Sequence, residues 1–187
     1  MSTIVQGTDE WLKLRQDKIG ASDAAIIMNM SPWKTPKALW EEKVGLRKPS
    51  ESSWFMQRGI ELEKDARELY ISAQKIFVEP KVKFHPTIDW MIASLDGIDN
   101  EETTIVEIKC PGRKDHELAK EGKIPEKYYP QLQHQMVVCS LPEAHYFSYD
   151  GQSGILLTIK RDDLFIERMM EEEERFWYCM RDFTPPD

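Results

Sequence analysis

The chain has 187 residues, of which 41% are apolar and 31% charged, the balance of an ordinary globular protein. This length suffices for one well-packed domain, and no linker or repeat marks a second, so we expect a single domain over residues 1–187. No stretch reaches the roughly 18–20 apolar residues that a membrane-spanning helix needs. The N-terminus lacks the basic and apolar segments of a secretory signal. We therefore expect a cytoplasmic protein without a membrane partner.

Cysteine usage and charge exclude few further classes. Cys110, Cys139 and Cys179 are scattered, which fits reduced thiols and argues against a zinc or iron–sulfur site. The formal net charge is −8, but residues 161–187 hold four Arg against nine Asp and Glu and carry −5 of it. Carboxylates that bind a divalent metal would neutralise much of the remainder. The net charge therefore does not exclude a nucleic-acid partner.

The first half of the chain is predicted to be helical. Thr8, Ser22 and Thr35 are suitable N-caps, and Thr35 is followed by a proline at the first helical position. A longer segment then has apolar residues at steps of three and four. The expected helices extend approximately over the ranges Thr8–Gln16, Asp23–Asn29, Pro36–Val44 and Ser53–Gln74.

The second half changes to a period of two. Three successive strands are expected at 77–84, 90–97 and 103–110, and the polar turn between the last two predicts a hairpin. A helix near Pro125–Ser140, two strands at 144–150 and 154–161, and a closing helix near Asp162–Asp182 complete the pattern. This order of elements predicts an α/β or α+β fold around one mixed sheet.

The strand at 103–110 carries two charged residues. Successive strand side chains alternate between faces, so Val106 and Ile108 point one way while Glu107 and Lys109 point the other, about 6.5–7 Å apart at their bases. The hairpin brings Asp96 near Glu107, within a residue or two of register. Two carboxylates this close repel each other unless a cation lies between them, and such oxygen ligands suit Mg²⁺ or Mn²⁺.

Each of these signals has an ordinary interpretation. Asp96 followed by glycine is more often a turn than a ligand, and Glu107 with Lys109 is more often a solvated strand face with a weak ion pair. An Asp some ten residues before Glu-x-Lys, on adjacent strands, is nevertheless the constellation of the PD-(D/E)xK nucleases. The combination is moderately specific where each part is not.

Five segments carry a closer resemblance. They are WLKLRQDKIGASDAA, RGIELEKDAR, ASLDG, VEIKCP and YYPQLQHQM, in the order seen in the lambda-exonuclease family, or YqaJ-like phage recombination nucleases. The resemblance runs from about Gly7 to Val137. It implies a restriction-endonuclease-like PD-(D/E)xK core with a central mixed β-sheet flanked by helices.

The resemblance also implies roles for the acidic residues. Asp96 and Glu107 would be metal ligands, assisted by the main-chain carbonyl of Ile108. Lys109 would orient and help activate the attacking water. Glu63, rather than Glu61 on another helical face, would complete the acidic cluster from the helix and touch a metal or its water.

Further roles fall outside the acidic cluster. Gln131 would hydrogen-bond the nucleophilic water or a metal ligand, with Gln135 one turn later on the same face; helix surface is the ordinary interpretation of both. Arg15, Ser22 and Ser94 match positions that form a 5′-terminal phosphate pocket in the family. Read alone, Arg15 is more often a surface residue, and the ordinary interpretation of Ser22 is a helix cap.

Two other polar features are given no role. His134 resembles a metal ligand, but we expect it to pack or to face solvent, because no second His lies at a ligand spacing. The run Glu171–Glu174 is expected to form a solvated helix face.

The resemblance implies an Mg²⁺-dependent 5′-to-3′ exodeoxyribonuclease, with Mn²⁺ as a possible substitute, acting on the ends of linear double-stranded DNA. It also implies a ring-like homotrimer, a single-strand annealing protein as partner in recombination, and a phage or prophage origin in a bacterial host. Two alternatives stay open: an endonuclease or nickase with the same core, and a DNA-binding module that has lost activity.

Overall fold

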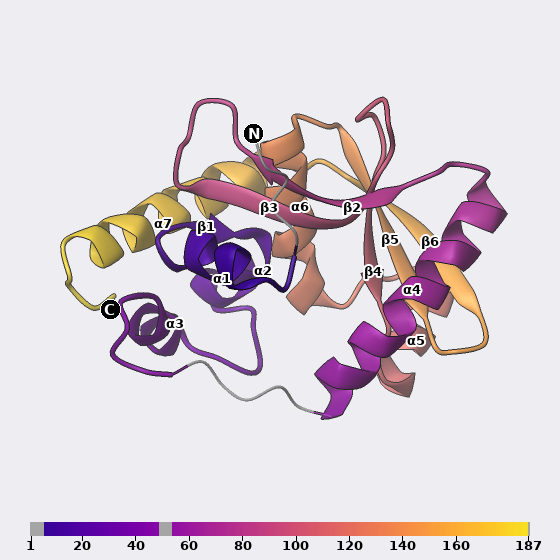
Figure 1. Cartoon of the computed structure of the whole chain (residues 1–187), viewed down its shortest axis with the longest axis horizontal. Coiled ribbons are helices and arrows are strands. Elements are labelled where there is room, and N and C mark those ends of the chain that lie inside the picture. The colour runs from indigo at the N-terminus through magenta and orange to yellow at the C-terminus, as the bar shows by residue number, and fades with distance from the viewer. Residues whose placement is uncertain (1–5, 49–53, 187) are drawn as a thin grey trace.

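A computed structural model describes residues 6–48 and 54–186 of the chain. It confirms a mixed α/β fold in which helices flank a central six-stranded sheet (Figure 1). The helices are α1 (Asp9–Gln16), α2 (Ala21–Ile27), α3 (Pro36–Lys43), α4 (Trp54–Gln74), α5 (Arg113–Lys120), α6 (Tyr129–Cys139) and α7 (Asp163–Arg181), with a 3₁₀ turn at Glu126–Tyr128. The strands are β1 (Ile19–Gly20), β2 (Glu79–Phe84), β3 (Met91–Ile98), β4 (Ile105–Lys109), β5 (Glu143–Tyr149) and β6 (Gly154–Lys160).

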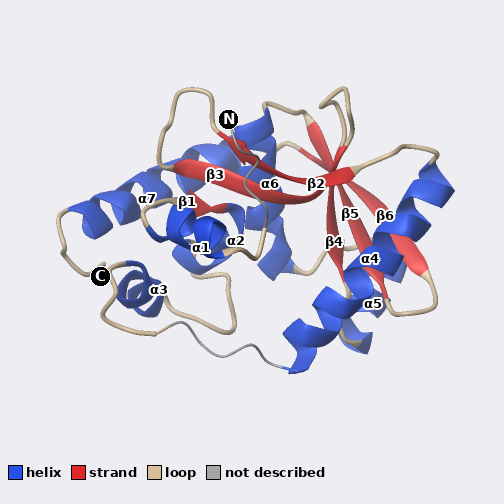
Figure 2. Ribbon diagram, in the orientation of Figure 1, coloured by secondary structure: helices blue, strands red, loops and turns tan. Residues whose placement is uncertain are grey.

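Strand β3 lies at the centre of the sheet. Two strands, β1 and β4, pair with different parts of the same edge of β3. Near its start it pairs in parallel with β1, through Ile19 opposite Met91. Near its end it pairs antiparallel with β4, through Gly97 opposite Val106, while β2 covers the other edge. Beyond this last pair β3 and β4 diverge, as Figure 2 shows. We call this divergence the strand fork.

The two faces of the sheet bury separate cores. Helices α2, α6 and α7 pack on the larger core, which includes Met136 of α6 and Met169 of α7. On the other face, Ala66 and Tyr70 of α4 pack against Val106. Strand β4 contributes to both cores, Ile105 to the larger and Val106 to the smaller, because helices cover both of its faces.

Gly97 marks the closest contact beside the strand fork. A Cβ at this position would lie 2.7 Å from Cγ1 of Val106 and 2.8 Å from Cγ2 of Val78, so only glycine fits between them. The Asp96–Gly97 pair therefore lies within a strand, and its interpretation as a turn is wrong.

Several element boundaries differ from the predicted ones. Helix α2 has Gly20 as its N-cap, so Ser22 lies within the helix, and the helix ends at Ile27 rather than Asn29. The helix expected over 125–140 is a 3₁₀ turn followed by α6, with Pro130 in its first turn. The expected start of α4 at Ser53 lies outside the described residues.

Two elements were not predicted. Strand β1 has only two residues, too few to show a period. Helix α5 is strongly polar, and the residues that it buries are His116 and Ala119, so it has no apolar stripe. Within the described ranges, no helix is long and apolar enough to cross a membrane.

Candidate active site

The acidic residues meet at the strand fork. Asp96 directly precedes the Gly97–Val106 pair, and its Oδ2 accepts a hydrogen bond of 2.9 Å from the main-chain N–H of Ile108. The carboxylate thereby bridges the two strands where they begin to separate. Glu107 directly precedes Ile108 on β4. The side chains of Asp96 and Glu107 therefore lie close together at the point where β3 and β4 begin to separate.

Three side chains contact the carboxylate of Glu107, and the residue is only 2% exposed. Lys109 Nζ lies 2.5 Å from Oε1 of Glu107, which also accepts a 2.6 Å hydrogen bond from Gln131. Gln135, one turn further along α6, donates to Oε2 at 2.5 Å. The ion pair is therefore buried on its acidic side rather than solvated, and neither glutamine is merely helix surface.

The charges of this cluster act strongly on one another. Burial raises the pKa of Asp96 well above its ordinary value, and the nearby Glu107 and Glu63 carboxylates raise it further. Burial alone would lower the pKa of Lys109, but the Glu107 and Asp96 carboxylates raise it above its ordinary value. The charged form of Lys109 is therefore favoured, whereas the charged form of Asp96 is disfavoured unless a further cation joins the cluster.

This arrangement fits a hard divalent cation. Within residues 6–48 and 54–186, no group of three or more Asp, Glu, His or Cys side chains is arranged to hold one ion. Mg²⁺, however, keeps several waters and is commonly held by one or two carboxylates together with substrate phosphates. The buried carboxylate of Glu107 and the half-buried carboxylate of Asp96, which repel each other, are the kind of donors that such binding needs.

Glu63 lies at the margin of the cluster. Its carboxylate pairs with Arg67 one turn later on α4, and Arg67 also donates to the main-chain carbonyl of Asp96 at 2.8 Å. Arg67 thus ties α4 to β3 and holds Glu63 near the acidic pair. Arg67 carries no distinctive signal in the sequence, because an Arg four residues after a Glu is common on helix surfaces.

The three residues of the expected phosphate pocket are linked through Trp11. Arg15 Nη2 donates to Oγ of Ser22 at 2.7 Å, and its guanidinium lies 4.7 Å from the Trp11 ring centre. Trp11 Nε1 in turn donates to Oγ of Ser94 at 2.8 Å. Ser94 is two residues before Asp96 on β3, so both side chains leave the same face of the strand.

The positive charge of this group is only partly neutralised. Asp23 lies 3.5 Å from Arg15, but it is closer to Lys43, whose Nζ is 2.7 Å away. Asp23 also accepts a hydrogen bond from the N–H of Gly20 at 2.9 Å. Burial alone would raise the pKa of Asp23, but Lys43 and Arg15 lower it. One carboxylate shared by two cations leaves a net positive charge near Ser22.

The remaining polar residues of α6 point elsewhere. Gln133 donates to the carbonyl of Lys160 at 2.9 Å. His134 is fully buried between Glu173 Oε1 at 2.8 Å and the carbonyl of Ile92 at 2.9 Å. The expectation of a wholly solvated face at Glu171–Glu174 is therefore wrong at Glu173, because this side chain packs under α6.

Comparison with known proteins places this arrangement in a family. A model of the YqaJ-like viral recombinase domain matches residues 10–142. The chain belongs to the YqaJ-like viral recombinase family. It is 34% identical over 176 residues to the uncharacterized protein YqaJ of Bacillus subtilis (strain 168), covering 90% of this chain and 55% of that protein. The chain therefore spans about half the length of this curated relative.

Solved structures agree with the family assignment. The alkaline exonuclease LHK-Exo of Laribacter hongkongensis is 31% identical, with a TM-score of 0.80 and coverage of 94% of this chain and 93% of that one. The same enzyme has been solved in complex with dAMP. A phage-related exonuclease from Haemophilus somnus 129PT shares the fold, with 14% identity, a TM-score of 0.65 and coverage of 89% and 96%.

Proposed function

We propose that the protein is a metal-dependent 5′-to-3′ exodeoxyribonuclease that degrades one strand of linear double-stranded DNA. The observation that carries the proposal is the convergence of Asp96, Glu107 and Lys109 at the strand fork. Membership of the YqaJ-like viral recombinase family and the likeness to an alkaline exonuclease support the same activity.

The chemistry follows from the charges at the strand fork. Asp96 and Glu107, with the main-chain carbonyl of Ile108, would hold one or two Mg²⁺ ions, and Glu63 would add negative charge from α4. Bound Mg²⁺ would polarise the scissile phosphate and lower the pKa of an attacking water. Hydrolysis would then break the bond between phosphorus and the 3′ oxygen.

The protein's own side chains would prepare this step. Gln131 and Gln135 donate to the two oxygens of Glu107 and so fix the plane of its carboxylate. Lys109 Nζ, 2.5 Å from Oε1 of Glu107, would place positive charge where negative charge accumulates on the phosphate oxygens. Its position is supported by the Tyr128 ring, whose centre is 5.1 Å away.

Direction would come from the pocket beside Trp11. Arg15 donates to the hydroxyl of Ser22, and a guanidinium can bind two phosphate oxygens at once. Ser94 and Asp96 leave the same face of β3 two residues apart. A 5′-terminal phosphate held near Ser94 would therefore lie close to the metal ligands, as removal of nucleotides from the 5′ end requires.

The biological setting is part of the proposal. We propose that the protein acts in the cytoplasm of a bacterial host, in phage-type recombination with a single-strand annealing protein. A homotrimer that encircles DNA would give processivity. Contacts to the phosphate backbone rather than to base edges would make cleavage largely independent of sequence.

The test uses linear duplex DNA with each strand labelled separately and with either a 5′-phosphate or a 5′-hydroxyl. With Mg²⁺ or Mn²⁺ we expect degradation from 5′-phosphate ends, and we expect Arg15→Ala to lose the preference for phosphate. Degradation from 3′ ends would contradict the polarity. Cleavage of covalently closed circular DNA would favour an endonuclease or nickase, and no cleavage of any substrate would favour an inactive DNA-binding module.

A further inference from the structure

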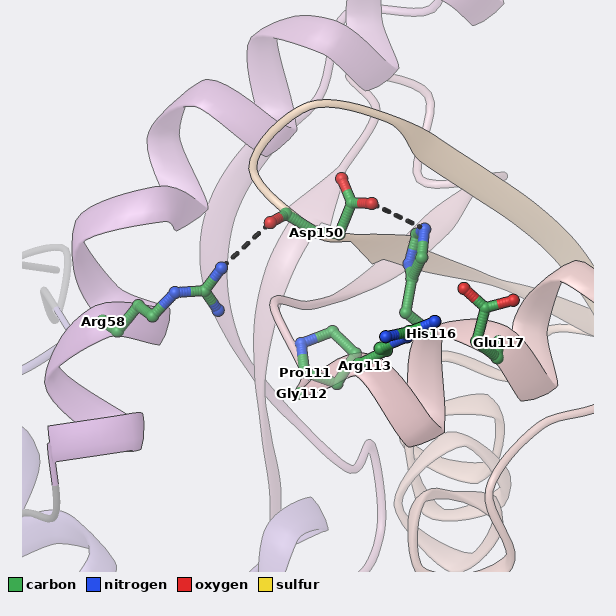
Figure 3. A pocket seen from close by; sticks show the side chains of 7 residues that line it. All are labelled: Arg58, Pro111, Gly112, Arg113, His116, Glu117 and Asp150. Carbon is green, nitrogen blue, oxygen red and sulfur yellow. Dashed lines mark hydrogen bonds and ion pairs between the residues drawn. The ribbon is translucent and has the colours of Figure 1, made fainter.

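A second positively charged hollow lies beside the strand fork. A half-open cavity of about 300 Å³ is bordered by the N-terminal part of α4, the start of α5 and the end of β5. Figure 3 shows Arg58 entering it from α4, opposite Pro111, Gly112 and Arg113, with Asp150 at its rim. Two arginine side chains thus lie at an opening that a ligand can reach.

Among the described residues, no carboxylate forms an ion pair with either guanidinium group. The hydrogen bonds of Arg58 to these residues go to main-chain carbonyls, that of Asp150 at 2.9 Å and that of Cys110 at 3.4 Å. Arg113 is exposed and makes no hydrogen bond or ion pair with any residue in the described part of the chain. Both side chains therefore carry positive charge that is available to a bound anion.

The two acidic residues that line the cavity have their own partners. Asp150 Oδ1 accepts hydrogen bonds from the N–H groups of Gln152 and Ser153, and its Oδ2 lies 3.3 Å from His116. These hydrogen bonds lower the pKa of Asp150 to about 2, so it remains an anion that is already satisfied. Glu117 pairs with Lys120 at 3.0 Å. Both carboxylates keep their negative charge, but their oxygens are engaged with these partners, and neither forms an ion pair with Arg58 or Arg113 among the described residues.

The backbone adds to the same preference for an anion. Gly112 is the N-cap of α5 and supplies no side-chain hydrogen bond to the first turn of the helix. Gly112 and Arg113 line the cavity, so the first turn of α5 adjoins it, and a helix N-terminus favours negative charge. This contribution supports the two guanidinium groups and does not replace them.

The position of the cavity relates it to the proposed nuclease site. Pro111 and Gly112 come directly after Lys109 and Cys110 at the end of β4, and Arg58 is five residues before Glu63 on α4. The Arg15 group lies along β3, on the other branch of the strand fork (Figure 1). The proposed metal ligands thus lie between the Arg15 group, which Asp23 partly neutralises, and the Arg58 and Arg113 pair.

We propose that the cavity lined by Arg58 and Arg113 binds an internal backbone phosphate of the DNA. This proposal rests on the proposed function and adds a second contact, separate from the 5′-terminal phosphate. Holding the strand on both branches of the fork would fix the scissile phosphate over the carboxylates.

The experiment measures binding of a 5′-phosphorylated linear duplex in EDTA, so that the strand stays intact. One phosphate at a time is replaced by an uncharged methylphosphonate. Arg113→Gln removes no hydrogen bond or ion pair within the described part of the chain, so it tests charge alone. Arg58→Gln also removes hydrogen bonds to two main-chain carbonyls. Arg168→Gln on α7 is the control, because it removes the same charge far from the cavity. Melting temperatures are measured for all variants.

For the wild type we expect one internal linkage whose neutralisation weakens binding about tenfold, the effect of one lost charge-assisted contact. Arg113→Gln, and the double variant that combines Arg58→Gln with Arg113→Gln, should bind unmodified DNA about tenfold more weakly. Neither should respond any longer to neutralisation of that linkage. Arg168→Gln should behave as the wild type does. The slope of log affinity against log salt should fall by about one in the double variant, as expected for one phosphate.

Other results would overturn the proposal. The cavity would not hold a backbone phosphate if the same linkage still mattered in Arg113→Gln. If Arg113→Gln instead weakened only the binding of dAMP, the cavity would take the phosphate of a free nucleotide. Failure of the wild type to degrade linear duplex with Mg²⁺ or Mn²⁺ is a separate result, which would contradict the proposed function itself.

Discussion

Two buried glutamates contact the same helix, α6, and they illustrate what separates a candidate catalytic acid from a structural one. Glu107 lies on β4 against Gln131 and Gln135, and Glu173 lies on α7 against His134. Both side chains are at most 2% exposed. Burial therefore does not distinguish them.

The difference lies in the neighbouring charges. Glu107 lies near a second carboxylate, Asp96, and shares a cluster that one lysine does not neutralise. Glu173 faces a single partner, His134, whose other ring nitrogen points to the carbonyl of Ile92. Since both ring nitrogens of His134 face acceptors, the protonated ring satisfies them and gives Oε1 of Glu173 its partner; Oε2 of Glu173 is buried with no hydrogen-bond partner among the described residues.

The largest expected effect concerns stability. His134→Leu leaves Glu173 buried without a partner, so we expect the free energy of unfolding to fall by about 3–5 kcal/mol. Replacing both residues with Leu should recover most of this loss, since an apolar pair needs no neutralisation. Urea denaturation checks both values; equal destabilisation of the single and double variants would contradict a closed ion pair.

The second prediction concerns the other side of α6. Lys109→Met should lower the rate of DNA degradation about a hundredfold to a thousandfold, because it removes the cation beside the reacting phosphate. Lys127 also lies over the Tyr128 ring but pairs with Asp115 at 2.6 Å, so Lys127→Met is the matched control. Rates under single-turnover conditions test this, and equal losses in the two variants would show that Lys109 has no special role.

Three glutamines on α6 sharpen the comparison further. Gln131→Leu and Gln135→Leu should each reduce activity about tenfold, since each removes one hydrogen bond that orients Glu107. Gln133→Leu should lower the melting temperature and leave the rate intact, because Gln133 bonds to the carbonyl of Lys160 and the N–H of Asp162. A loss of activity in Gln133→Leu without unfolding would contradict this division.

The smallest expected effect is on the pH dependence of stability. Burial alone would lower the pKa of His134, but the Glu173 carboxylate raises it above its ordinary value. Because the folded-state pKa lies above the unfolded one, the stabilisation is full below about pH 6.5 and is lost as pH rises through the folded-state pKa. Unfolding curves for the wild type and Glu173→Gln should therefore converge as pH increases above neutral, and a constant difference would contradict it.

Much of the strand fork could be predicted from the sequence. The period of two in 103–110 placed Glu107 and Lys109 on one face, and the hairpin brought Asp96 to them. Local spacing decides both features, so tertiary structure had little to add. The ordinary interpretation of Glu107 and Lys109 was a solvated strand face. In the structure α6 covers this face and buries Glu107.

Features that depend on distant contacts could not be predicted in this way. Glu173 is one of four consecutive glutamates, and only the packing of α7 under α6 decides which of them is buried. Trp11 joins Arg15 to Ser94 across 83 residues of sequence. Helix α5 lacks an apolar stripe, so the cavity that it forms with Arg58 left no local pattern in the sequence.

The most direct test of the central claim is the Mg²⁺-dependent degradation of linear duplex by Glu107→Gln and Glu173→Gln, measured side by side at a temperature where both are folded. We expect Glu107→Gln to lose at least about a thousandfold in rate, since the metal site and the orientation of Lys109 both depend on this carboxylate. Glu173→Gln should retain nearly the wild-type rate with a lower melting temperature. Wild-type activity in Glu107→Gln would contradict the account.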